Sequence, residues 1–409
     1  MTYHDGLPGK YNRPIMNPTF IKPRYDSGGY AGIPDRITEA FASKKYDAVV
    51  LFLVDGFGWR FYERFQDAAF IQRIAKHGRI EKLTSQFPST TAAHVTTIHT
   101  GLPVGQSGVY EWIYYEPEVD AVIAPLLFSY AGTMERDTLK SSGIQAASLL
   151  PRGVLYPTLK QMGVEPYVFG VRDYTPSTYS RVAMAGAEQV AFKTVSEALV
   201  NVGSLLEKQT KPTYVHLYFD RFDALGHEYG PAASQTEAEA ETFLLMMEYY
   251  FERIFKGNKR ILFLMTADHG QVEVDPQTTI YLNRDARFAG VERFIKTNRQ
   301  GKLIVPAGSA RDMFLYIKDE RLDEAQAFLT PRLEGRADVV KTETLIQEGY
   351  FGAEVSPRFR ARAGNLVILP YAYETVWWYE KDRFEMRFRG HHGGLTPQEM
   401  ETVLYSLES

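Results

Sequence analysis

Residues 49–56 read Val-Val-Leu-Phe-Leu-Val-Asp-Gly, an apolar run that ends in a carboxylate and a glycine. A continuous apolar run rich in Val and Leu is typical of a parallel strand that is buried on both faces. Gly56 allows a tight turn directly after this strand, so Asp55 is expected at the carboxyl end of the strand. Because ligands of parallel sheets gather at that edge, Asp55 is a candidate site residue.

Strands and helices alternate along the chain on both sides of this segment. Further apolar strands are predicted at residues 166–170, 214–219 and 260–266, with helices at residues 194–209 and 235–254. Such alternation is the signature of a parallel sheet with helices on both faces. The predicted fold class is therefore α/β, with a largely parallel sheet.

The remaining segments divide into an arm, an insertion and a closing segment. Residues 1–34 are predicted to form an irregular N-terminal arm, which either wraps the surface or makes a homo-oligomer contact. Residues 271–386 are interrupted by Gly and Pro and are interpreted as a smaller mixed α+β insertion or lid. The core is predicted at residues 35–270 and 387–409, with a last helix over residues 396–404 that begins with a capping box.

Composition excludes several classes of protein and site. The chain has 409 residues and a net charge of −4, which does not suit a binder of duplex DNA. It has no cysteine, which excludes disulfides, thiolate metal sites and a cysteine nucleophile. We find neither the apolar region of a signal peptide nor a run of 18 apolar residues. The default expectation is a cytoplasmic protein without a membrane span.

A second stretch, residues 87–94, reads Phe-Pro-Ser-Thr-Thr-Ala-Ala-His and precedes a helix predicted to end at Gly101. Thr90 is expected at the start of this helix, where the helix dipole and free N–H groups favour an anion. A hydroxyl in that position is either a helix cap or a nucleophile. For a lone Thr, the cap is the more common role.

Metal-type side chains follow several of the predicted strands or stand beside glycines. Asp and neutral His together suit zinc or manganese, whereas a carboxylate shell poor in His suits magnesium better. Taken one at a time, each has a plain structural role as a cap, a turn former or a surface residue, but together they favour a metal centre. These residues are Asp55, Asp223, His227, Asp268, His269 and the pair His391-His392.

In this order, the residues resemble the alkaline phosphatase superfamily and, within it, the type I phosphodiesterase/nucleotide pyrophosphatase branch. The resemblance covers residues 46–270 and the segment from residue 390 to the end. It implies an alkaline phosphatase-like core and two divalent metal ions, zinc or alternatively manganese. By this resemblance, one ion is held by Asp223, His227 and His392, and the other by Asp55, Asp268 and His269, with Thr90 as a further ligand.

The resemblance also implies the reaction. Thr90 would attack phosphorus and form a covalent phosphothreonine, because a coordinated hydroxyl loses its proton more easily. The expected substrate is a small-molecule phosphate diester or a nucleotide. The candidate substrate-binding residues are Thr91, Glu111 and Tyr218. Glu111 stands where relatives commonly carry Asn, and an ionised Glu would repel a phosphate oxygen, so Glu111 either binds a substrate amine or hydroxyl or holds another cation. Tyr218 either stacks on a base or belongs to the core, and His391 has at most a supporting role.

Two other functions stay open at the level of the sequence. A phosphomonoesterase, or another phosphoryl or sulfuryl hydrolase, would use the same core. The Cys/Ser-x-Pro-x-Arg motif of the usual sulfatases is absent from the chain. The other alternative is a catalytically inactive binding protein, against which the intact nucleophile and ligand positions argue.

Overall fold

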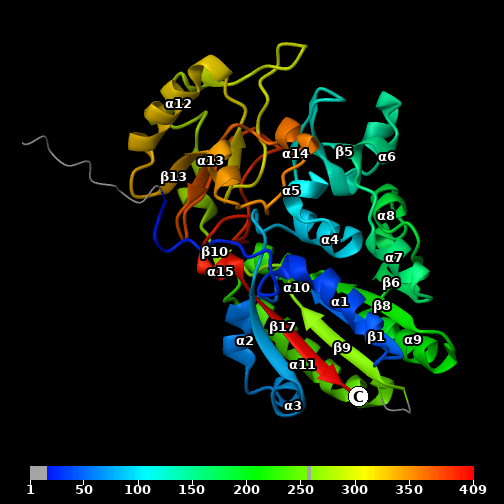
Figure 1. The fold of residues 1–409 in the computed structure, drawn as a ribbon. Coiled ribbons are helices and arrows are strands. Elements are labelled where there is room, and N and C mark those ends of the chain that lie inside the picture. Colours follow the sequence, from blue (N-terminus) through cyan, green and yellow to red (C-terminus); the bar gives the residue numbers. More distant parts are fainter. Residues whose placement is uncertain (1–15, 256–258) are drawn as a thin grey trace, which may run out of the picture.

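The computed structural model describes residues 16–255 and 259–409, so the first 15 of residues 1–34, predicted as an arm, lie outside the described residues (Figure 1). Its centre is a seven-stranded sheet in the order β2-β17-β9-β1-β8-β6-β7. Only β17 runs antiparallel to its neighbours in this sheet, which agrees with the predicted, largely parallel arrangement. The strands are β1 (Ala48–Val54), β2 (Arg79–Thr84), β6 (Glu165–Val171), β7 (Glu188–Phe192), β8 (Thr213–Phe219), β9 (Ile261–Thr266) and β17 (Glu401–Glu408).

Helices cover both faces of this sheet, as the apolar pattern of residues 49–54 predicts. All seven residues of β1 are buried, and alternate side chains join two different core clusters. One cluster includes α1 (Ile33–Ala42), α4 (Thr91–Thr100) and α7 (Leu155–Gln161). The other includes α3 (Ala69–His77), α9 (Val195–Lys208) and α11 (Ser234–Phe255). The predicted α/β fold class is therefore confirmed.

The register of the central strands brings their carboxyl ends together. β1 pairs in parallel with β8 and with β9, so that Val54 lies opposite Phe219 and Leu53 opposite Thr266. The segments that follow these three strands therefore meet at one edge of the sheet. One of them continues into α10 (Arg221–Tyr229).

The helix predicted over residues 396–404 is wrong in its second half. The predicted capping box is present, but α15 (Pro397–Met400) ends after one turn and β17 follows at once. β17 pairs with β2 on one side and β9 on the other, so its backbone groups are satisfied by two neighbours. Its buried Thr402, Val403 and Tyr405 are residue types that suit a strand.

A second, smaller group of elements lies within residues 271–386 and packs beside the main sheet (Figure 1). It holds an antiparallel sheet in the order β12-β14-β13. The division into a core and an insertion remains a prediction. The elements are β12 (Met313–Leu315), β13 (Ala337–Lys341), β14 (Leu366–Pro370), α12 (Leu322–Leu329), α13 (Thr342–Gln347) and α14 (Pro357–Arg362).

The remaining short helices and strands are distributed over both groups and the segments between them. They are α2 (Trp59–Phe65), α5 (Val104–Ser107), β3 (Tyr114–Glu116), β4 (Ala121–Ala124), β5 (Ser129–Tyr130), α6 (Ala146–Leu149), α8 (Thr178–Ala183), β10 (Val272–Glu273), β11 (Ile280–Tyr281), β15 (Val376–Trp377) and β16 (Gly390–His391). β10 pairs with β16, which carries the C-terminal segment back toward the end of β9.

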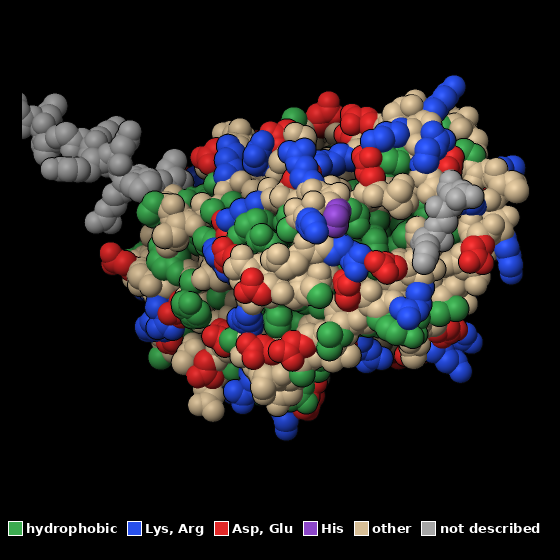
Figure 2. Space-filling view, turned by 90° about the horizontal axis from the view of Figure 1, so that it is seen from below, with side chains coloured by type: hydrophobic (Ala, Val, Ile, Leu, Met, Phe, Trp, Pro, Cys, Tyr) green, Lys and Arg blue, Asp and Glu red, His purple; other side chains and the backbone are tan. Residues whose placement is uncertain are grey.

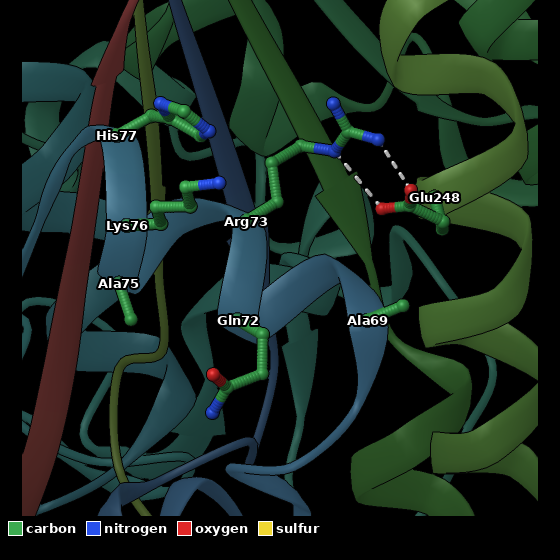
Figure 3. A pocket seen from close by; sticks show the side chains of 7 residues that line it. All are labelled: Ala69, Gln72, Arg73, Ala75, Lys76, His77 and Glu248. Atoms are coloured by element: carbon green, nitrogen blue, oxygen red, sulfur yellow. Dashed lines mark hydrogen bonds and ion pairs between the residues drawn. The ribbon is translucent and has the colours of Figure 1, made fainter.

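The surface carries charges of both signs. On the face in Figure 2, basic and acidic side chains are interspersed. Among the described residues, no helix combines the length and the apolar character that crossing a bilayer requires. A cavity of about 530 Å³ lies between α3 and α11, on the sheet face opposite α4 (Figure 3). Its Arg73 side chain is paired with Glu248, and none of the predicted site residues lines it.

Candidate metal centre

Two groups of three side chains converge at the carboxyl edge of the main sheet. Within each group, one ligand atom from every residue lies within 4.8 Å of the others. We call Asp55, Asp268 and His269 the inner trio, and Asp223, His227 and His392 the outer trio. These are the same two sets that the resemblance implied, although their roles as ligands remain predictions.

The inner trio is fully enclosed by the ends of β1 and β9. Its side chains are at most 3% exposed. His269 Nε2 lies 3.5 Å from Asp55 Oδ1 and 3.4 Å from Asp268 Oδ2. The N–H of Gly56 donates to Asp268 Oδ1 over 3.1 Å, and the Tyr218 hydroxyl donates to Asp55 Oδ2. The remaining oxygen, Asp268 Oδ2, has no hydrogen-bond partner in the described part of the chain.

The outer trio joins α10 to the segment after β16. Asp223 and His227 lie four residues apart on α10, and His227 Nε2 is 3.3 Å from Asp223 Oδ2. His392 Nε2 lies 3.1 Å from His227 Nε2 and 3.7 Å from Asp223 Oδ1. The Nδ1 atoms of His227 and His392 each lie 2.8 Å from a backbone carbonyl, of Gly390 and Ser89 respectively. These carbonyls orient both rings so that the Nε2 atoms face Asp223.

The two trios are in direct contact with each other. The rings of His269 and His392 are stacked with centroids 3.7 Å apart. A Cβ atom on Gly56, where φ is +75°, would lie 3.2 Å from Asp223 Cβ. Glycine therefore permits both the turn after β1 and the close approach of α10. The geometry suits two cations held side by side.

The electrostatics of the two trios differ. Burial raises the pKa of Asp55 well above its usual range, and the charges of Asp268 and Asp223 raise it further. Burial also raises the pKa of Asp268 to about 7. Burial is the largest influence on Asp223 and opposes its ionisation, but the charge and hydrogen bond of His227, with the charges of His392 and His269, together lower the pKa of Asp223. Burial lowers the pKa of His392 to about 4. The inner trio therefore has unbalanced negative charge, whereas the outer trio partly balances its own.

The structure distinguishes the two threonines at the start of α4. Thr90 is the residue before the helix, is 2% exposed and makes no side-chain capping bond. Its side chain lies near Glu111, whose pKa it lowers. The Thr91 hydroxyl lies 3.2 Å from His269 Nε2 and 3.3 Å from Asp55 Oδ1, and Thr91 is partly exposed. Thr90 has an extended backbone (φ −125°, ψ 142°), whereas Thr91 is the first residue of the helix, so the two side chains leave the backbone in different directions.

The other predicted substrate residues are placed differently from expectation. Tyr218 is a partly buried residue of β8 whose hydroxyl is engaged by Asp55, which favours a role in orienting Asp55 over base stacking. Glu111 is 1% exposed and lies beside Asp312, a neighbour that the sequence did not predict. His391 Nδ1 lies 2.9 Å from its neighbour's carbonyl oxygen, as part of the local turn.

Sequence reasoning also missed Gln271. Its Nε2 donates to Asp223 Oδ1 over 2.5 Å and to the Asp223 carbonyl over 3.0 Å. A Cβ atom on Gly226 would lie 2.1 Å from Gln271 Oε1, so this glycine makes room for the amide. The signal in the sequence was only its place directly after Asp268-His269-Gly270.

Comparisons with known proteins agree with this geometry. The family model described as type I phosphodiesterase/nucleotide pyrophosphatase matches residues 49–395. The structure of murine ectonucleotide pyrophosphatase/phosphodiesterase 5 has a TM-score of 0.65 and 15% identity, and the match covers 88% of this chain and 87% of that chain. An inactive threonine-to-alanine variant of it, in complex with AMP, gives the same values.

The human ectonucleotide pyrophosphatase/phosphodiesterase 5 structure has a TM-score of 0.65 and 14% identity over 88% of this chain and 87% of that chain. A comparison with curated proteins gave no match. At these identities, the solved structures establish the fold alone, and the family match is what concerns function.

Proposed function

This chain belongs to the type I phosphodiesterase/nucleotide pyrophosphatase family, and we propose that it cleaves phosphodiester or pyrophosphate bonds with two divalent metal ions and Thr91 as nucleophile. Family membership supports the coarser statement that it is a hydrolase of this kind. The metal ions, the covalent intermediate and the roles of single residues are our proposal. The observation that carries it is the approach of the Thr91 hydroxyl to Asp55 and His269.

The donor sets of the two trios fit divalent cations. The outer trio offers two imidazoles and one carboxylate, which is a common zinc set, and the inner trio offers one imidazole and two carboxylates. The unpartnered Asp268 Oδ2 and the raised pKa values of Asp55 and Asp268 both indicate negative charge without a counter-charge. Zinc suits both sets, and manganese is the alternative.

Thr91 replaces Thr90 as the proposed nucleophile. The sequence favoured Thr90 because it stands at the helix start, but Thr90 is buried and Thr91 is the residue whose hydroxyl has hydrogen-bond contacts to Asp55 and His269. The partly exposed Thr91 hydroxyl is the one beside the inner trio, where substrate can reach it. Thr91 is the first residue of α4, so its attack would take place at the positive end of the helix dipole.

The chain's own residues account for binding, attack and orientation. The first N–H groups of α4 lack a side-chain cap and can donate to a phosphate oxygen. Two bound divalent ions would lower the pKa of the nucleophile and offset charge on the attacking and leaving oxygens. The Thr91 oxygen then forms a bond to phosphorus while the bond to the leaving oxygen breaks. Water hydrolyses the resulting phosphothreonine and restores the hydroxyl.

The substrate class follows from the family and remains a proposal. A nucleotide or another small phosphate diester is favoured, since the similar murine protein was solved in complex with AMP. Phosphomonoester hydrolysis on the same core is the competing activity. Turnover of bis-p-nitrophenyl phosphate against p-nitrophenyl phosphate, with and without a chelator, separates the two. A cytoplasmic location and a homo-oligomeric state also remain predictions.

The test of the nucleophile is a matched pair of variants at the start of α4. Thr91→Ala should reduce turnover by roughly 1,000-fold or more, because the attacking oxygen is lost. Thr90→Ala should reduce it by less than about tenfold, and Thr91→Ser should keep measurable turnover because it keeps a hydroxyl. Zinc content, measured by elemental analysis, should stay the same in Thr90→Ala. A larger loss in Thr90→Ala than in Thr91→Ala would return the role to Thr90.

A further inference from the structure

Two buried carboxyls lie beside the start of α4, and the proposed reaction does not use them. Glu111 is 1% exposed and Asp312 is 0% exposed. The Trp112 N–H donates to Glu111 Oε2, and Ser309 donates to Asp312 Oδ1 through its N–H over 3.0 Å and its hydroxyl over 2.5 Å. Within the described residues, the other oxygen of each carboxyl, Glu111 Oε1 and Asp312 Oδ2, has no hydrogen-bond partner.

The two carboxyls and the Thr90 hydroxyl surround one small region. The Glu111 carboxyl is within hydrogen-bonding reach of the side chains of Asp312 and Thr90. Burial raises the pKa of Glu111 to about 8, and burial together with the charge of Glu111 raises the pKa of Asp312 well above its usual range. Two ionised carboxylates cannot remain side by side in a buried place without a compensating positive charge.

The nearest arginine in the sequence does not supply that charge. Arg311 donates to the two carboxylate oxygens of Glu399 over 3.0 and 2.9 Å. It also donates to the backbone carbonyls of Tyr371 and Glu374. Its guanidinium is therefore committed to the contact between the insertion and the C-terminal segment, and the Glu111–Asp312 pair needs another partner.

The pair adjoins the metal centre on two sides. Thr90 directly precedes Thr91, and the Ser309 hydroxyl also lies 3.2 Å from the carbonyl oxygen of His392. A Cβ atom on Gly393 would lie 2.4 Å from Ser309 Oγ and 2.7 Å from Asp312 Oδ1. Glycine at this position thus allows Asp312 to lie against the segment that carries His392.

We propose that Glu111, Asp312 and Thr90 hold a third divalent cation, of the Mg²⁺ or Mn²⁺ class, at a site separate from the two trios. The donors are two carboxylates and a hydroxyl, and hard oxygen donors without imidazole or thiolate select these ions over zinc. This site goes beyond the proposed function, which requires only the two trios.

A cation explains the pair better than a shared proton does. With one shared proton, the two carboxyls would keep a charge of −1 close to the place where an anionic phosphate must bind, and this charge would repel the substrate. A divalent cation brings the local charge to zero. The N–H and O–H donors on Glu111 Oε2 and Asp312 Oδ1 also favour the ionised form of both groups.

The test measures Mn²⁺ binding to protein that is already saturated with Zn²⁺. Zinc outcompetes manganese at the His-containing trios, so added Mn²⁺ should report on the oxygen-only site. We expect the wild-type protein to bind one additional Mn²⁺ by isothermal titration and by the Mn²⁺ electron paramagnetic resonance signal. Glu111→Gln and Asp312→Asn should each weaken this binding by about 100-fold or more, with unchanged zinc content. Glu118→Gln, an exposed carboxylate of the same segment, should change nothing.

Each outcome bears on one proposal only. Wild-type protein that binds zinc at both trios but no additional Mn²⁺ overturns the third site, assigns a shared proton to the pair and leaves the proposed function intact. Additional Mn²⁺ that persists in both variants also overturns it, because the ion then lies elsewhere. Failure of the trios to hold zinc counts against the proposed function instead. Each variant removes one of two apposed carboxyls. In the presence of a chelator, the thermal unfolding temperature of each variant should therefore equal or exceed that of the wild type.

Discussion

The inner and outer trios lie against each other, but the charge of their buried carboxylates is balanced in different ways. The outer trio has one carboxylate and two imidazoles, is 10–16% exposed at its side chains, and lets His227 compensate Asp223. The inner trio has two carboxylates and one imidazole, and is 0–3% exposed. Burial raises the pKa of both of its carboxyls, and the charge of Asp268 raises that of Asp55 further, so the inner trio depends on a cation that the protein itself does not supply.

This difference predicts that the two trios bind their ions with different strengths and exchange them at different rates. A site that needs a cation to balance its charge binds the cation tightly and exchanges it slowly. A site that is partly balanced and more exposed releases its ion more readily. The Thr91 hydroxyl lies on the inner side, next to Asp55 and His269, where the stronger unbalanced charge would hold an ion against it. The following predictions test how far this contrast extends.

The largest expected effect comes from removing one carboxylate from each trio. Asp268→Asn and Asp223→Asn should both reduce turnover by more than about 100-fold, which exceeds the usual effect of changing an outer hydrogen-bond partner. In metal-free protein, the two substitutions should change the free energy of unfolding in opposite directions. Asp268→Asn removes one of two apposed carboxyls and should raise the free energy of unfolding, whereas Asp223→Asn removes the partner of His227 and should lower it, each by about 1 kcal/mol.

Thermal or denaturant unfolding of the chelated proteins measures these two changes. Elemental analysis of the same variants reports which zinc equivalent is lost. Equal destabilisation by both substitutions would contradict the contrast between the trios.

The next effect concerns pH. The pKa of Asp268 is about 7 in the folded state and near 3.9 in an unfolded chain. The folded state therefore holds the extra proton between these values, and the free energy of unfolding of metal-free protein should fall as pH rises from about 4 to about 7. We expect this contribution to be on the order of 4 kcal/mol.

The Asp268→Asn variant isolates this contribution, because His227 and Asp223 still titrate in it. Asp223 has a lowered pKa, so its own stabilisation is present above about pH 4 and is lost only below that value. The quantity to measure is the difference in free energy of unfolding between wild type and Asp268→Asn at several pH values. A constant difference across this range would show that Asp268 does not carry the raised pKa.

A smaller effect is expected in the order of metal loss. During exposure to a chelator, zinc should leave the outer trio roughly tenfold faster than the inner trio, because the outer side chains are more exposed and partly balanced. Zinc content followed over time should show two phases. The Asp223→Asn variant lacks a ligand of the outer trio and should therefore lose zinc in the slow phase only. A single phase for the wild type would indicate that the two ions leave together.

The smallest effect concerns the hydrogen-bond donor beside each trio. Tyr218 donates to Asp55, and Gln271 donates to Asp223. Tyr218→Phe should weaken zinc at the inner trio by about tenfold, and Gln271→Met should do the same at the outer trio, since such outer partners orient the ligands. Competition with a chromophoric chelator measures both affinities. If each variant weakens both sites equally, the donors act on the centre as a whole.

Much of this architecture was predictable because the relevant patterns are local. A buried apolar run followed by Asp-Gly indicates a central parallel strand with a carboxylate at its end, and the same logic places Asp268 and His269 after β9. The i, i+4 spacing of Asp223 and His227 places both on one face of α10. The alternation of these elements predicted the α/β fold class.

Other features depend on contacts that no local pattern contains. The capping box of α15 reads as the start of a long helix, yet residues 401–408 complete the sheet because β2 and β9 leave a place between them. Gln271 gains its role only because Gly226 lies against its amide. Asp312 is 201 residues from Glu111 in the chain, and only the packing of the elements within residues 271–386 brings it there.

The choice between Thr90 and Thr91 as the proposed nucleophile also depends on tertiary contacts. Residue types and their order were enough to identify the family, the sheet and the set of candidate ligands, because strand burial and helix faces repeat with fixed periods. They were not enough to say which of two adjacent hydroxyls faces the inner trio. The backbone changes from extended at Thr90 to helical at Thr91, and the direction of each hydroxyl is set by how α4 packs against the sheet.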